Sequence, residues 1–221
     1  VVFLMDRFGY AKTVDVSVYE RNKEAADTEN RYILTCKNTD KICIFTNKGQ
    51  MHLLKVLDLP YGKFRDKGIP IDNLSNYDSS EENFIYIINL GAIIHSRLLF
   101  GTRTAMLKMV DGSEFDVAKR TTASTKLNED DELLIVHAMT GEETVVMQSE
   151  KEMFLRIEAS TIPEKKKGAV GVRGMKLNAG DALSNIYVLD GENEQTVEVK
   201  GKEVVLNRLR VGNRDTKGTK R

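Results

Sequence analysis

The chain has few of the side chains on which metal sites and covalent catalysis depend. Only two cysteines and three histidines occur among its 221 residues. Cys36 and Cys43 form a C-x6-C pair without a nearby histidine, which matches no common zinc spacing. No nucleophile elbow, H-E-x-x-H or C-x-x-C motif surrounds the histidines. The sequence therefore disfavours a zinc site and a hydrolase, and we expect free, buried thiols in a reducing cytoplasm.

Long hydrophobic runs and an excess of one charge are also missing. The longest apolar stretch, residues 84–94, is interrupted by Asn89 and is well short of the roughly 20 residues that cross a bilayer. The first residues show no basic segment followed by an apolar one, so we expect no signal peptide and no membrane contact. Lys plus Arg and Asp plus Glu both number 33, which excludes a uniformly basic nucleic-acid binder but allows basic patches.

What the chain does contain is an internal repeat. Five segments share an apolar strand, a short polar turn and a second strand that carries a cation shortly after the turn. The segments start near residues 1, 42, 97, 144 and 196. The cations are Lys12, Lys55, Lys108, Arg156 and Arg208. In the third repeat Thr104 stands where a turn glycine is expected.

Each repeat continues with a basic loop, a third strand, an acidic turn and a fourth strand. The basic loops end at Leu74, Leu127 and Leu177, and "NEDDE" and "SSEEN" are examples of the acidic turns, which we interpret as solvated. Four strands at a period near 50 residues predict an all-β, propeller-like disc of about five four-stranded blades in one domain, residues 1–221. The alternative is a single sandwich with similar strands. Helix is expected only in residues 19–30.

The glycine-rich stretch "GAVGVRGMKL", residues 168–177, has the spacing G-x-x-G-x-x-G. Neither a dinucleotide loop nor a P-loop has this pattern, so nucleotide binding is disfavoured. Three glycines this close also argue against a helix and favour a bulge, a turn or a close approach of another backbone.

Three motifs resemble the C-terminal domain of the A subunit of bacterial type IIA topoisomerases, DNA gyrase and topoisomerase IV. They are "FGYAKTVDVSVYE", "GQMHLLKVLDLP" with "RDKGIPIDNL", and "GVRGMKL" with "NAGDAL". The resemblance covers essentially the whole chain. It implies a β-pinwheel, in which strands are exchanged between blades and duplex DNA bends around a basic rim. It also implies that residues 168–177 are the loop and inner strand of the fourth blade, with glycines that let the chain cross between blades.

The resemblance implies a set of DNA-contacting rim residues in the strands and basic loops. They are Lys12, Lys55, Lys63, Arg65, Lys67, Lys108, Lys119, Arg120, Arg156, Lys165, Lys166, Lys167, Arg173, Lys176, Arg208, Arg214 and Lys217.

The sequence departs from the gyrase pattern after the first "YE". Gyrases carry a Q-R-R-G-G-K-G box there, but this chain has the acidic "YERNKEAADTEN". A segment that is only distantly similar to the box, "GNRDTKG", occurs at residues 212–218. Loss of the box favours topoisomerase IV-like behaviour. The last repeat stops before its final strand, which leaves a closed and an open disc as alternatives.

The family likeness implies a non-catalytic domain that binds and bends DNA for the strand-passage core. The catalytic part of the subunit would lie N-terminal to it, and ATP and Mg²⁺ would be used elsewhere in the enzyme, so we expect no cofactor and no metal here. The implied partners are double-stranded DNA, the rest of its own polypeptide and the ATPase B subunit, in the cytoplasm. Two alternatives remain: a gyrase domain that wraps DNA for negative supercoiling, and a protein-interaction propeller.

Overall fold

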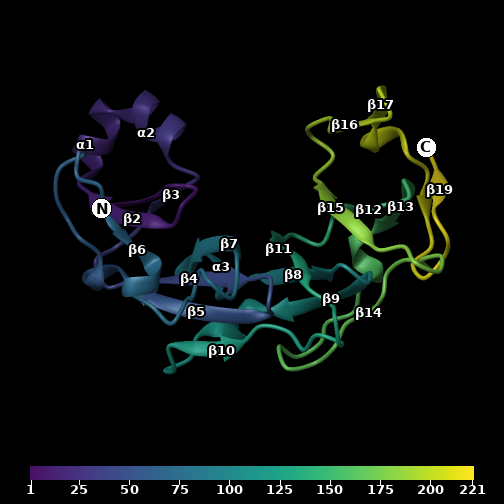
Figure 1. Ribbon diagram of the computed structural model, residues 1–221, viewed down its shortest axis with the longest axis horizontal. Coiled ribbons are helices and arrows are strands. Elements are labelled where there is room, and N and C mark those ends of the chain that lie inside the picture. The colour runs from purple at the N-terminus through teal and green to yellow at the C-terminus, as the bar shows by residue number, and fades with distance from the viewer.

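The computed structural model describes all 221 residues as four small antiparallel-rich sheets, called blades 1 to 4, and a C-terminal hairpin (Figure 1). Blade 1, with the order β3-β1-β2-β6, comprises β1 (Val2–Met5), β2 (Tyr10–Val14), β3 (Tyr32–Thr35) and β6 (Ile69–Pro70). Blade 2, with the order β10-β5-β4-β7, comprises β4 (Lys41–Thr46), β5 (Gln50–Lys55), β7 (Phe84–Asn89) and β10 (Thr121–Ala123).

The remaining strands form blades 3 and 4 and the hairpin. Blade 3, with the order β11-β8-β9-β14, comprises β8 (Arg97–Thr102), β9 (Met106–Asp111), β11 (Leu133–Met139) and β14 (Val172–Arg173). Blade 4, with the order β15-β12-β13-β18, comprises β12 (Thr144–Ser149), β13 (Met153–Glu158), β15 (Leu183–Leu189), β18 (Val211–Gly212) and β19 (Thr219–Lys220), which also pairs with β13. The hairpin is β16 (Thr196–Val199) and β17 (Lys202–Val205).

Each blade is built on a tight hairpin whose turn contains one residue in the left-handed region. Gly9 and Gly49 take that position in blades 1 and 2, with φ of 89° and 73°. In blade 3 the residue is Ala105, with φ of 68°, so the sequence-based choice of Thr104 was wrong by one position. Ala105 is fully buried, and its packing compensates for a backbone conformation that favours glycine.

The strand that follows each basic loop does not join the sheet of its own repeat. It pairs with the second hairpin strand of the preceding blade, as β6 does with β2, β10 with β5, β14 with β9 and β19 with β13. We call β6, β10, β14, β18 and β19 the outer strands, and β3, β7, β11 and β15 the inner strands. This is the strand exchange that the resemblance implies, and it ties each repeat to its neighbour.

The glycine-rich stretch is therefore part of this exchange and not the inner strand of blade 4. Val172 and Arg173 pair with Leu107 and Met106 at the outer edge of blade 3. The expected close crossing is confirmed for Gly171, where an ideal Cβ would lie 2.4 Å from the carbonyl oxygen of Leu107. Gly174 also crosses closely, whereas Gly168 has nothing within 4 Å.

The hydrophobic core consists of separate clusters between consecutive sheets. One cluster joins blades 1 and 2 around Phe3 and Ile44, and another joins blades 2 and 3 around Phe45 and Phe100. A third, rich in methionine, joins blades 3 and 4, and a smaller one joins blade 4 to the hairpin. Each blade buries its faces only against its neighbours, as in repeat proteins.

Two helices cover the face of blade 1 that points away from blade 2. α1 (Val16–Arg21) and α2 (Lys23–Glu29) lie close to the expected helix at 19–30, and Ala26 packs with Val2, Leu4 and Val14 of blade 1. α3 (Leu90–Ile93) was not expected from the sequence; the side chain of Asn89 caps it by accepting a hydrogen bond from the Gly91 N–H. Short 3-10 turns follow four of the hairpins, at η1 (Val56–Asp58), η3 (Gly112–Phe115), η4 (Ala159–Thr161) and η5 (Leu206–Arg208), and η2 (Ile71–Asn73) follows the outer strand β6.

The blades follow one another along an arc, with α1 and α2 at one end and the β16–β17 hairpin at the other (Figure 1). The fifth repeat does not form the expected four-stranded blade. Residues 211–220 supply the outer strands of blade 4 and leave the hairpin as a two-stranded sheet. Of the two alternatives from the sequence, the open arrangement is the one observed. No helix is long and apolar enough to span a membrane.

Candidate nucleic-acid interface

The expected cations are concentrated in four loops that lead into the outer strands. These loops cover residues 60–68, 116–120, 163–171 and 213–218, and each lies at the outer edge of the preceding blade. The acidic turns lead instead into the inner strands β7, β11 and β15, at the opposite edge of each sheet. In Figure 1, β10 and β14 lie on the convex side of the arc and β7 and β11 on the concave side. The topology thereby separates basic loops from acidic turns although the net charge is zero.

At blade 1 the loop presents Lys63, Arg65 and Lys67, all exposed. The Asp66 carboxylate accepts a hydrogen bond of 2.8 Å from the Lys63 N–H and holds the turn. The Lys67 ammonium lies 4.7 Å from the centroid of the Tyr10 ring, which orients it by a cation–π contact.

Blade 2 gathers cations from two repeats. Lys55, Lys119 and Arg120 line one small cavity, and Arg120 Nη2 donates to the Leu74 carbonyl at 2.9 Å. Lys41, which sequence reasoning missed, lines the same cavity and pairs directly with Lys55 across the β4–β5 hairpin. Like charges directly opposite each other are destabilising unless an anion compensates them, and this cross-strand pairing is the signal that identifies Lys41.

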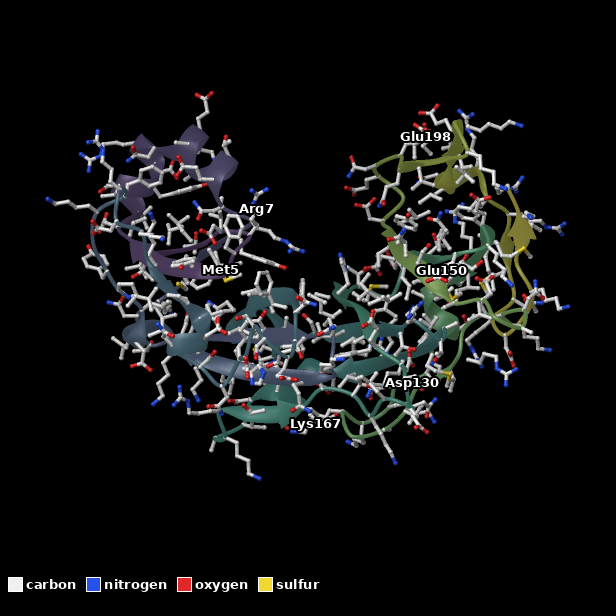
Figure 2. All side chains as sticks on the ribbon, viewed as in Figure 1. Met5, Arg7, Asp130, Glu150, Lys167 and Glu198 are labelled. Atoms are coloured by element: carbon white, nitrogen blue, oxygen red, sulfur yellow. The ribbon has the colours of Figure 1, made fainter.

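Blade 3 carries the densest basic loop. Lys165 and Lys166 are exposed, and their ammonium groups make no hydrogen bond or ion pair. Lys167 is half-buried and donates to the Glu114 carbonyl at 3.0 Å; Figure 2 shows it on the convex side of the arc. Arg173 on β14 and the neighbouring Lys176 are exposed, and Arg173 pairs loosely with Asp215 at 3.6 Å.

At blade 4, Arg208 and Lys217 are exposed. Arg214 is half-buried, because its guanidinium donates to the carbonyls of Thr161 and Arg173 and ties the last loop to the preceding one. A groove beside β13 is also lined by two cations that were not predicted, Arg210 and Arg221.

Three of the cations predicted for the rim bind backbone carbonyls; Lys108 is buried, and Lys12 and Arg156 are half-buried. Lys108 is 1% exposed and donates to the carbonyls of Lys166, Lys167 and Ala169. Lys12 donates to the carbonyls of Phe64 and Asp66. Arg156 donates to the carbonyls of Asn207 and Leu209. Of the five cations that follow the hairpin turns, Lys55 and Arg208 are exposed. The expectation of an exposed rim position is wrong for Lys108, because its ammonium binds the backbone of a crossing loop.

His52 also contacts a crossing segment. No motif in the sequence indicated a partner for its ring, but the structure gives each ring nitrogen one. Its Nδ1 lies 2.8 Å from Thr121 Oγ1 on β10, and its Nε2 lies 2.7 Å from Glu82 Oε2. His52 and Glu82 are both almost completely buried, so the interpretation of the whole "SSEEN" turn as solvated fails at Glu82. The Thr121 hydroxyl also accepts a hydrogen bond from Asn76, and we interpret the group as a link between β5, β10 and the acidic turn.

The two cysteines are free and buried. Burial raises the pKa of the Cys43 thiol to about 12, which keeps it protonated and unreactive at neutral pH. No group of three or more His, Cys, Asp or Glu side chains is arranged to hold a metal ion.

Comparison with known proteins points to one family. The family model for the DNA gyrase C-terminal domain, a beta-propeller, matches residues 96–138 and 143–190, in blades 3 and 4. The chain is 28% identical over 237 residues to the DNA gyrase A protein of Lawsonia intracellularis, and over 238 residues to that of Staphylococcus epidermidis. These alignments cover 99% and 100% of the chain but only 29% and 26% of the relatives, so the chain spans between a quarter and a third of their length.

Solved structures with the same fold carry related names. The C-terminal domain of DNA topoisomerase IV aligns with a TM-score of 0.87 at 22% identity, over 99% of this chain and 71% of that one. The E. coli ParC C-terminal domain gives 0.78 at 15% identity, over 100% and 93%. The DNA gyrase A C-terminal domain gives 0.65 at 18% identity, over 99% and 75%. Relatives along the whole chain, the family match of residues 96–138 and 143–190 and the shared β-pinwheel fold agree, and the chain is similar throughout to the C-terminal domains of type IIA topoisomerase A subunits.

Proposed function

We propose that this domain binds duplex DNA along the outer edge of its blades and bends it, without catalysing a reaction itself. The observation that carries the proposal is the separation of charge within each sheet, with basic loops at the outer strands and acidic turns at the inner ones. Phosphate contacts supply most of the sequence-independent affinity for DNA. Basic loops repeated along a convex edge favour a duplex that curves around it.

In this proposal the parent protein is part of a topoisomerase that acts in the bacterial cytoplasm. Its own N-terminal part and the ATPase B subunit would supply strand passage, ATP hydrolysis and Mg²⁺ chemistry. The domain would select and bend the duplex that is offered to that core.

We infer a topoisomerase IV-like role in preference to chiral wrapping by a gyrase. The region after the first "YE", where gyrases carry their basic box, is folded into α1 and α2. Ala26 packs this helical pair onto blade 1, so no basic loop crosses from here to another blade.

The alternative of a protein-interaction propeller has less support, because the exposed large hydrophobic side chains come from different elements. The five of them lie in the hairpin turn of blade 1, in α1, in the segment after β5 and at the outer edge of blade 4. They are Phe8, Val16, Leu57, Tyr61 and Val211.

A gel-shift series with duplexes of increasing length tests the main proposal. Smooth bending of 20 to 30 base pairs costs on the order of 1 to 6 kcal/mol, and only a duplex that reaches several blades gains enough phosphate contacts to offset this. We expect affinity to rise steeply with length from about one to several helical turns and then level off, and to fall with salt. Affinity that is independent of both length and salt would overturn the proposal.

Ligation of nicked circular DNA in the presence of the domain tests the topoisomerase IV-like role. A gyrase-like domain that wraps DNA with fixed chirality traps writhe and shifts the linking number in one direction. We expect compaction or bending without such a shift. A one-directional shift that grows with protein concentration would favour the gyrase alternative.

A further inference from the structure

One position on the second hairpin strand faces the crossing segment of the next repeat in blades 1, 2 and 3. It lies three residues after the left-handed residue of the hairpin turn. The residues at this position are Lys12, His52 and Lys108, and Leu155 takes it in blade 4. The first three bind the segment that arrives from the following repeat, through carbonyl oxygens or through the Thr121 hydroxyl.

Lys108 makes the most complete set of contacts. Its ammonium donates to the carbonyls of Lys166, Lys167 and Ala169 at 3.0, 3.1 and 2.8 Å. The Phe100 ring lies 5.5 Å from the ammonium, and the side chain is almost entirely buried. All three acceptors belong to the most basic loop of the domain.

Lys12 repeats the arrangement at blade 1. Its ammonium donates to the carbonyl of Asp66 at 2.7 Å and to that of Phe64, and it lies 5.0 Å from the Phe64 ring. Both acceptors are in the loop that carries Lys63, Arg65 and Lys67. A lysine that points into the fold thus organises two of the four basic loops by their main chain.

The chemistry of the contact requires a charged lysine. An ammonium has three N–H donors, one for each of the three carbonyls, whereas a neutral amine has two donors and directs a lone pair at the third oxygen. With its carbonyls turned inward to Lys108, the loop exposes the side chains of Lys165 and Lys166. The loop conformation and its charge display are therefore coupled.

We propose that Lys108 and Lys12 are positioning residues that shape the basic loops of blades 3 and 1 for phosphate binding. The DNA-binding part of this inference rests on the proposed function, but the control of loop structure does not.

Burial sets the pKa of both lysines. It lowers the pKa of Lys108 to about 8, and Glu114 of η3 opposes this shift. Burial also lowers the pKa of Lys12, against the opposing charges of Glu29, Asp66 and Asp6. Between pH 8 and the ordinary lysine pKa of 10.5, the unfolded chain binds the proton of Lys108 more than the folded one, so this group raises global stability as pH rises.

Hydrogen exchange at the Ala169 amide, which donates to the Lys166 carbonyl within the loop, measures loop order without DNA. Lys108→Met keeps the length of the side chain and removes its charge; at pH 7 we expect its protection, corrected for the intrinsic exchange rate, to be at least tenfold lower than that of the wild type. If Lys108→Met does not fold, the corresponding variant Lys12→Met, read at loop 60–68, decides the question.

DNA affinity for a duplex of several helical turns tests the second part, with Lys166→Met as the matched control. Each variant loses one charge, but Lys166 is exposed and Lys108 is not. We expect Lys108→Met to weaken binding at least as much as Lys166→Met. Unchanged Ala169 protection in Lys108→Met would overturn the loop assignment, and lost protection with wild-type affinity would overturn its role in binding. If the wild type itself does not bind, the proposed function fails, and the exchange data still decide the loop assignment.

Discussion

Gly171 lies directly against the carbonyl oxygen of Leu107, so closely that a Cβ on Gly171 would be 2.4 Å from that oxygen. The contact is between backbones of two repeats, where the exchanged strand β14 joins β9. Neither backbone can move away without breaking the pairing of β14 with β9. The absence of a side chain at this position is what allows blade 3 to receive its outer strand.

The first prediction concerns this contact. Gly171→Ala should lower the free energy of unfolding by about 1 to 3 kcal/mol, the usual cost of forcing an extra methyl group into a packed site. Gly168→Ala is the matched control, because a Cβ at Gly168 would have nothing within 4 Å, and it should change stability by less than about 0.5 kcal/mol. Denaturant unfolding of both variants measures the difference, and equal effects would contradict the close crossing.

A second prediction addresses the loop of blade 3. Replacing Lys165 and Lys166 with Ala removes two exposed charges without removing an internal contact, whereas Lys167 also bonds to Glu114. Binding should weaken uniformly across DNA sequences, because interactions with phosphates carry no sequence code. The slope of log affinity against log salt should flatten by roughly 0.9 for each phosphate that the variant no longer neutralises.

The control for this variant removes charge from an acidic turn. Glu129→Gln with Asp130→Asn should not weaken binding, since both residues are exposed and precede the inner strand β11. Asp131 is left intact because its carboxylate accepts hydrogen bonds from the Thr104 N–H and hydroxyl at 3.0 and 2.7 Å. If the lysine double variant keeps the wild-type affinity and salt slope, this loop is not part of the proposed DNA interface.

The third prediction tests Lys41, a cation that the structure identifies and the sequence did not. Lys41→Ala should weaken DNA binding and flatten the salt slope, because Lys41 lines one cavity with Lys55, Lys119 and Arg120. Lys48→Ala removes the same charge from the same hairpin, but at its β4–β5 turn, and should bind like wild type. Fluorescence anisotropy at several salt concentrations compares the two, and equal losses would show that overall charge matters and the cavity does not.

A fourth prediction concerns the buried link at blade 2. Glu82→Ala leaves the His52 ring nitrogen without its partner at 2.7 Å, and an unsatisfied buried polar group costs about 1 to 3 kcal/mol. Glu81→Ala removes a neighbouring exposed carboxylate and should be nearly neutral. Thermal unfolding of the two variants distinguishes them; similar melting temperatures would mean that the His52–Glu82 contact contributes little.

The sequence by itself determined the repeating elements and the places where charge collects. Alternating apolar residues and tight turns specify each hairpin locally, so the four hairpins at the cores of the blades could be predicted from the residues themselves. The loops with Lys63, Lys119 or Lys165 were identified correctly as basic segments between strands. Their composition and position in the repeat are local properties of the chain.

Only the tertiary structure decided which sheet each outer strand joins. β14 has two residues, and so short a segment contains no pattern that distinguishes the sheet of its own repeat from the preceding one. For the same reason the sequence could not separate Lys108 from Lys165. The local sequence around a lysine in a strand does not show whether its ammonium faces water or three carbonyls. For Lys108, those carbonyls belong to residues 58 to 61 positions further along the chain. The exchange of strands between blades brings them together, and it thereby decides which cations hold the loops and which stay exposed.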